Sequence, residues 1–132
     1  MKNFGTLALL LVFAMGGTAA KASQSPGTKE VAIGLSDAFI PGGFSSASDA
    51  YVVASGLFPN SCYTWKRADV SNPDTFTHEV KSFATVSQGM CLMVLVPFNK
   101  EIRLGQLAEG KHTLRFLNGD GTFMEKSLTI EE

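Results

Sequence analysis

The chain has 132 residues, and its 11 Lys and Arg against 12 Asp and Glu give a formal net charge of −1 at pH 7. The charges are scattered and form no basic stripe, so nucleic acid and anionic membranes are poor partners. The length suffices for a single domain with a single core.

Residues 1–22 have the pattern of a secretory signal peptide. An uncharged run rich in Leu, Ala and Phe (residues 4–14) is followed by small residues, with Ala20 and Ala22 at the −3 and −1 positions before Ser23. Signal peptidase requires small side chains there, and a site two residues earlier fits as well. The apolar run is too short to span a bilayer. We expect an exported protein, periplasmic or secreted, with no membrane span after removal of the leader.

Two cysteines, Cys62 and Cys91, lie beyond this leader. In an oxidising compartment two cysteines pair by default, and their separation is not that of a C-x-x-C redox motif. We therefore expect a structural disulfide. Closing a loop of about 30 residues stabilises a chain by roughly 3 to 4 kcal/mol in the chain-entropy model.

The chain after a short polar stretch (23–29), which we expect to be flexible, reads as one all-β domain over residues 30–132. Its apolar runs are short and rich in β-branched and aromatic residues, and Gly, Pro, Asn, Asp or Ser clusters separate them. This rhythm predicts an antiparallel, immunoglobulin-like β-sandwich of seven to eight strands. The predicted strands are Glu30–Leu35, Asp49–Ser55, Cys62–Val70, Thr75–Thr85, Cys91–Pro97, Glu101–Leu104, Lys111–Leu117 and Thr122–Ile130.

Two of these strands have a distinctive pattern. Lys111–Leu117 alternates polar and apolar residues and leads into Asn118-Gly119-Asp120-Gly121, which favours a tight hairpin turn. The run Cys91–Val96 is apolar at every position. That pattern predicts a central strand buried on both faces, or a strand covered by a loop.

Aromatic residues mark two candidate ligand-binding sites. Tyr63, Trp65 and Arg67 alternate along one predicted strand and so should share a face. An exposed face would offer a platform for sugar rings or a peptide, whereas a buried face would place the aromatics in the core with Arg67 at its edge. Phe39 and Phe44 bracket an apolar, glycine-containing loop that is either a binding tip or a plug over one end of the sandwich.

No catalytic, metal or cofactor site is predicted. His78 and His112 are the only histidines and therefore the only histidine bases that could activate a serine, and the chain has no G-x-S-x-G motif. The two histidines are 34 positions apart, which is no metal-ligand spacing, so both are interpreted as half-buried strand residues. The 118–122 segment lacks the later ligands of a calcium loop and is interpreted as a turn.

Several residues resemble a known group of domains. Gly56-Leu57-Phe58-Pro59-Asn60-Ser61-Cys62-Tyr63, a second Cys, Pro97-Phe98, Leu104 to Gly110 and Asn118-Gly119 are similar to small exported bacterial immunoglobulin-like β-sandwich domains with one disulfide. The shared pattern, G-x-x-P-x-x-C-Y … C … P-F … L-x-x-G-x-Y … N-G, covers about residues 50–125. The resemblance implies fold, export and disulfide but no activity. His112 stands where the group usually has Tyr.

These features favour an exported, non-catalytic binding or envelope-interaction module whose partner is a protein or glycan in the envelope or outside the cell. One alternative is a secreted protease inhibitor that presents a loop, with 39–48 and 71–75 as candidates. Another is an assembly subunit in which a neighbour completes an edge strand. The short polar stretch 23–29 counts against this last alternative.

Overall fold

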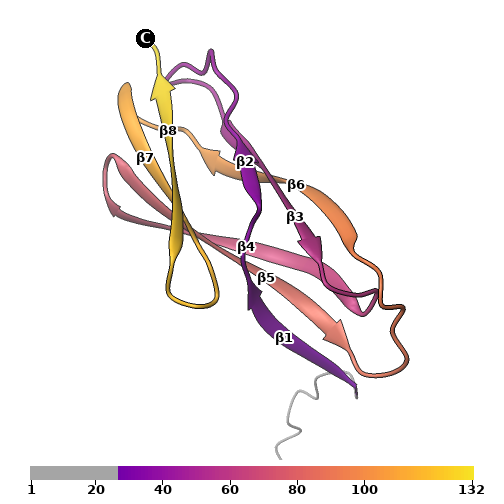
Figure 1. Ribbon diagram of the computed structural model, residues 1–132. Coiled ribbons are helices and arrows are strands. Elements are labelled where there is room, and N and C mark those ends of the chain that lie inside the picture. Colours follow the sequence, from indigo (N-terminus) through magenta and orange to yellow (C-terminus); the bar gives the residue numbers. More distant parts are fainter. Residues whose placement is uncertain (1–26) are drawn as a thin grey trace, which may run out of the picture.

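The computed structural model describes residues 27–132, so the predicted signal peptide and residues 23–26 lie outside the described residues. The described residues form eight strands and no helix, which confirms the all-β prediction (Figure 1). The strands are β1 (Thr28–Ile33), β2 (Asp37–Phe39), β3 (Ala50–Phe58), β4 (Tyr63–Asp74), β5 (Thr77–Ser87), β6 (Val96–Gly105), β7 (Gly110–Leu117) and β8 (Phe123–Ile130).

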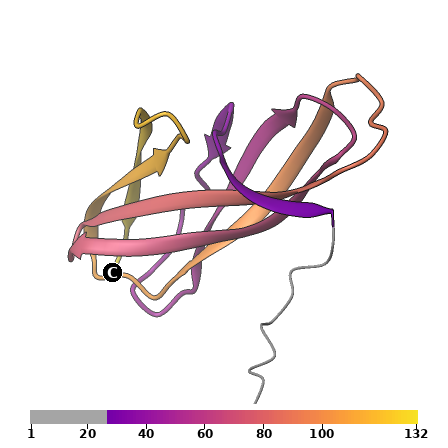
Figure 2. The same cartoon turned by 90° about the horizontal axis from the view of Figure 1, so that it is seen from below.

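The strands form one sheet of five and one of three. In the five-stranded sheet, β5 pairs with β4 along most of its length. The other edge of β5 pairs with β1 through residues 82–87 of β5 and with β7 through residues 77–81 of β5. Strand β8 extends the sheet beyond β7. The three-stranded sheet has the order β2-β3-β6. Strand β5 is therefore the structural centre of the larger sheet (Figure 2).

One strand pair departs from the predicted antiparallel arrangement. Strands β5 and β7 are parallel, in a register that pairs Thr77 with Thr113 and Lys81 with Leu117, whereas all other named pairs in the described residues are antiparallel. The chain leaves the larger sheet after β5, forms β6 in the smaller sheet and returns as β7. A crossover of this kind can bring two strands of one sheet together in the same direction.

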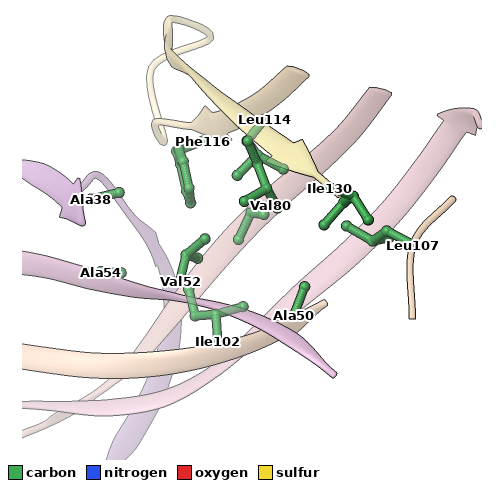
Figure 3. Close-up of a cluster of buried hydrophobic side chains, with 11 residues drawn as sticks. Ala38, Ala50, Val52, Ala54, Val80, Ile102, Leu107, Leu114, Phe116 and Ile130 are labelled. Atoms are coloured by element: carbon green, nitrogen blue, oxygen red, sulfur yellow. The ribbon is translucent and has the colours of Figure 1, made fainter. Parts of the chain in front are cut away.

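The core lies between the two sheets, because each sheet turns one row of apolar side chains toward the other. Figure 3 shows Val52 and Ile102 of the smaller sheet facing Val80, Leu114 and Phe116 of the larger one. All five are at most 4 % exposed. Two layers with a shared apolar interior are the arrangement of a β-sandwich.

The strands depart most from the predicted ones in three places. The short β2 was not predicted, because three residues carry little periodic signal. Residues 71–74, predicted as a turn, belong to β4, and only two residues separate that strand from β5. Strand β6 begins at Val96 and includes Glu101–Leu104, so the predicted strand Cys91–Pro97 is wrong over most of its length.

Candidate functional site

The disulfide between Cys62 and Cys91 is present and joins the start of β4 to the loop between β5 and β6, with 5.3 Å between the Cα atoms. Two hydrogen bonds reinforce the joint. The Ser61 amide donates to the Leu92 carbonyl at 3.0 Å, and the Leu92 amide donates to the Ser61 hydroxyl at 2.7 Å. The backbone of the β5–β6 loop is therefore fixed at its midpoint by one covalent and two polar contacts.

The side chains of this loop point into solvent. Five large apolar residues, called here the apolar tip, are exposed: Met90 by 103 %, Leu92 by 70 %, Met93 by 82 %, Val94 by 53 % and Leu95 by 66 %. The predicted central strand buried on both faces is thus wrong. The loop pairs with Ser61 and not with a neighbouring strand, so no sheet covers its side chains.

The chain segments that form and flank the apolar tip are uncharged. The chain has no Asp, Glu, Lys or Arg between Lys81 and Lys100, and none between Gly56 and Trp65, which includes the connection that the disulfide joins to the tip. Figures 1 and 2 both show the β5–β6 loop extending beyond the sheets at one end of the molecule. Contiguous exposed apolar side chains of this kind mark interaction sites on soluble domains.

The predicted shared face of Tyr63, Trp65 and Arg67 is wrong. The register between β4 and β5 shifts between Trp65 and Arg67, so Lys66 forms a β-bulge and the alternation of faces is broken there. Sequence periodicity assumes an unbroken strand and therefore cannot detect a bulge of one residue.

The bulge sends the aromatic and the cationic side chains to opposite faces of the sheet. Tyr63 and Trp65 are half-buried against the core, with the Tyr63 ring 5.7 Å from Phe58 and the Trp65 ring 5.6 Å from Phe98. Arg67 lies on the outer face, where its guanidinium is 4.3 Å from the centre of the Phe83 ring. The two aromatics thus pack inward.

Charged side chains surround Phe83 on the outer face of the larger sheet, with Arg67 and Lys81 both near its ring. Arg67 forms ion pairs with Glu30 and, at 3.2 Å, with Asp69, and the pKa of Glu30 is lowered by its hydrogen bonds to Lys66 and Arg67. A cavity of about 370 Å³ lies beside this cluster, lined by Ala32, Lys81, Leu117, Asn118, Gly119, Gly121 and Thr122. Its mixed lining gives a polar ligand such as a sugar a place to bind.

The loop bracketed by Phe39 and Phe44 divides into two parts. Phe39 is 67 % exposed, at the end of β2. Phe44 is half-buried against the core, meets the Tyr51 ring edge-on at 5.3 Å, and its carbonyl accepts a hydrogen bond from the Glu131 amide. The loop therefore folds back at Phe44 and leaves one aromatic ring in solvent.

His78 and His112 lie together in the core, although nothing in the sequence pattern indicates that they meet. Both are at most 3 % exposed, and Nε2 of His78 is 2.8 Å from Nδ1 of His112. Nε2 of His112 donates to the Ala108 carbonyl at 2.6 Å, so its Nδ1 accepts from His78 when both rings are neutral. The remaining nitrogen of His78 lies 2.5 Å from the Asn72 side chain.

The environment of His78 favours its neutral form. Burial lowers the pKa of His78, the nearby His112 lowers it further, and Asp74 opposes both effects. In the part of the chain that the structure describes, no three His, Cys, Asp or Glu side chains gather as metal ligands. The pair is best understood as a buried polar contact between β5 and β7, whose parallel pairing the sequence could not reveal.

Two further observations place the chain among known proteins. Residues 27–132 contain no helix that is long and apolar enough to cross a membrane. No curated protein and no solved structure matches the chain. The family model of the ORF11 beta-sandwich domain matches residues 52–130, which is more than half of the chain and extends from β3 to the end of β8. The chain belongs to the family of the ORF11 beta-sandwich domain.

Proposed function

We propose that this protein is an exported, non-catalytic binding module that docks onto its partner through the apolar tip. The observation that supports this function is the succession of five exposed apolar side chains on a loop whose backbone is fixed by a disulfide and two hydrogen bonds. A fixed backbone loses little conformational entropy on binding, so more of the free energy of burial remains as affinity.

The free energy available from burial of the tip is comparable to the cost of association. Complete burial of one Leu, Met or Val side chain is worth about 1.5 to 3 kcal/mol. The five side chains of the tip are each more than half exposed, so most of that free energy is still available to a partner. The sum over five side chains is of the same order as the cost of association, about 4 to 15 kcal/mol, so the affinity depends on how little entropy the fixed loop loses on binding.

Export, bacterial origin and the immunoglobulin-like type are parts of the same proposal. The signal-peptide pattern of residues 1–22 supports a periplasmic or secreted location, and the Cys62–Cys91 disulfide suits an oxidising compartment. The resemblance to small exported bacterial domains supports the origin. Eight strands in two facing sheets support the immunoglobulin-like type, with the parallel β5–β7 pair as a departure.

The two alternative functions have less support. Of the loops considered for a protease inhibitor, 39–48 packs on the core through Ile40 and Phe44, and most of 71–75 belongs to β4. An assembly subunit requires an open edge for a neighbouring strand, and an apolar loop tip is not such an edge. A glycan partner would use the cavity beside Lys81 and not the tip.

A site-specific photo-crosslinking residue tests the docking surface. It is placed at Met93 in the apolar tip and, as a matched control, at the exposed Glu109 in the β6–β7 connection. We expect a discrete adduct in the native envelope only from position 93, and its loss in a Leu92→Ser/Leu95→Ser background. Equal adducts from both positions, or an adduct that survives the double substitution, would contradict docking through the tip.

A further inference from the structure

We infer that the apolar tip inserts into the interfacial layer of a lipid bilayer, so that the partner is a membrane surface. This inference rests on the proposed function, because it names the partner of the same surface. It concerns attachment to one leaflet by a loop and not a membrane span.

The first argument is the exposure of the tip. Its five residues lie in a single loop at one end of the sandwich (Figures 1 and 2), and the side chain of each is more than half exposed. No tip residue lines the cavity beside Lys81, and none lines a second, more open cavity of about 250 Å³ between Gly56 and Phe98. The tip thus lines neither of these cavities, and a fluid lipid layer can surround an exposed apolar loop without a pre-formed groove.

The second argument is the absence of charge. The whole segment from Ser82 to Asn99 is uncharged, as is the connection from Pro59 to Cys62 that faces it across the disulfide. Transfer of a charged side chain into an apolar layer is expensive, and the tip with the connection joined to it enters such a layer without one. Protein interfaces, in contrast, generally surround an apolar centre with a polar rim that forms hydrogen bonds.

The third argument is the pair of residues behind the tip, Lys29 and Tyr63. Lys29 of β1 and Tyr63 of β4 both pair with Val86 of β5, on its two opposite edges. Val86 precedes Met90, the first residue of the tip, by four positions, which is at most about 13 Å at a rise of about 3.3 Å per residue. Interfacial segments enter a bilayer to about 5 to 10 Å, so a tip inserted to that depth leaves both residues outside the apolar layer. Lys29 is exposed and Tyr63 half-buried, and an ammonium and a phenol suit the headgroup level.

These arguments also predict the mode of binding. The apolar side chains supply the free energy, and the lysine only adds to it. Attachment should therefore occur on zwitterionic lipid and persist at high salt, since only attraction between exposed charges is screened by salt.

The test uses a reporter tryptophan in the disulfide-bonded mature protein. Because Trp65 is the only tryptophan of the chain, Trp65→Phe removes the background and Met93→Trp places the reporter in the tip. On phosphatidylcholine vesicles we expect a blue shift of the emission and quenching by brominated acyl chains, still present at about 0.5 M salt. Glu109→Trp in the same background is the matched control and should show neither change.

A second measurement does not depend on the reporter variants. Cosedimentation of the otherwise unmodified protein with phosphatidylcholine vesicles should weaken by about tenfold or more in Leu92→Ser/Leu95→Ser. The thermal unfolding midpoint of this double variant should equal that of the parent, because neither side chain is part of the core. Vesicles that include phosphatidylglycerol show how much the charges behind the tip add.

Three results would overturn the inference. If no vesicle binds while the crosslinker at Met93 still yields a tip-dependent protein adduct, the tip docks onto a protein and only the proposed function stands. If the protein dimerises in solution and Leu92→Ser/Leu95→Ser abolishes the dimer without any vesicle binding, the partner is a second copy. If no vesicle binding, adduct or dimer depends on the tip, both the inference and the proposed function are wrong.

Discussion

Loss of the disulfide should remove a large part of the stability of this domain. Cys62 and Cys91 are separated by 29 positions. In the chain-entropy model a closed loop of about 30 residues removes about 12 cal/mol/K from the entropy of the unfolded chain, or about 3.6 kcal/mol at 25 °C. Small domains are stable by only about 5 to 15 kcal/mol in total. The reduced protein should therefore unfold at a much lower denaturant concentration than the oxidised one.

Reduction is a cleaner perturbation than mutation, because Cys62 is buried and an alanine in its place would also leave a small void. The assay is urea unfolding of the same protein with and without a reductant, at one pH. We expect the free energy of unfolding to fall by about 3 to 4 kcal/mol. The slope of the free energy of unfolding against urea concentration reports the surface that is exposed on unfolding. A steeper slope for the reduced protein would show that its unfolded chain is more expanded.

A loss below about 1 kcal/mol would refute this reasoning, and it would mean that the reduced unfolded chain keeps the β4–β5 hairpin closed without the crosslink.

Hydrogen exchange separates the effect of the disulfide on stability from its effect on the position of the tip. The Leu92 amide donates to the Ser61 hydroxyl, so its protection reports whether the tip stays anchored. If reduction leaves that amide as protected as before, the disulfide is not what fixes the tip.

Two further predictions concern the core. The pKa of His78 is lowered from its ordinary value of 6.5, so the unfolded chain takes up a proton that the folded one resists, and stability should be full above about pH 6.5 and fall as the pH drops below it. Urea unfolding between pH 7 and 5 checks this fall, which His78→Gln should abolish; a flat profile in the parent protein would contradict it. Gly56 has no room for a side chain, because a Cβ there would lie 2.5 Å from the Phe98 ring, whereas Gly42 has open space. Gly56→Ala should destabilise by about 1 to 3 kcal/mol in thermal unfolding and Gly42→Ala far less, and Phe98→Leu should restore part of the loss; equal effects at the two glycines would show that the contact with Phe98 is not the cause.

Local signals in the sequence predicted much of the fold. Strand periodicity located the cores of seven of the eight strands, and the Asn118–Gly121 turn joins β7 to β8 as expected. The disulfide followed from the count of cysteines and the expected compartment. The strands and the turn depend on residues that are close together in the chain. The disulfide could be predicted because two cysteines allow only one pairing.

The remaining features depend on which distant segments meet. An apolar run such as 91–96 has the same composition whether a neighbouring strand covers it or a disulfide fixes it in solvent, so periodicity alone could not distinguish the two. The bulge at Lys66 changes which face Arg67 occupies without changing the sequence pattern. His78 and His112 meet because β5 and β7 are parallel neighbours, and the crossover that makes them neighbours leaves no local signal.

The exposed tip requires an explanation outside the fold. Its five side chains are not part of the buried core, so polar residues in their place would leave the packing between the sheets intact. An exposed uncharged apolar run also raises the risk of aggregation through edge pairing. Here the disulfide and the Ser61 hydrogen bonds hold the backbone of the run outside the strand ladders, which lowers that risk and leaves the side chains exposed. Apolar side chains that are costly in solution and contribute nothing to the packed core are accounted for when they are buried on docking.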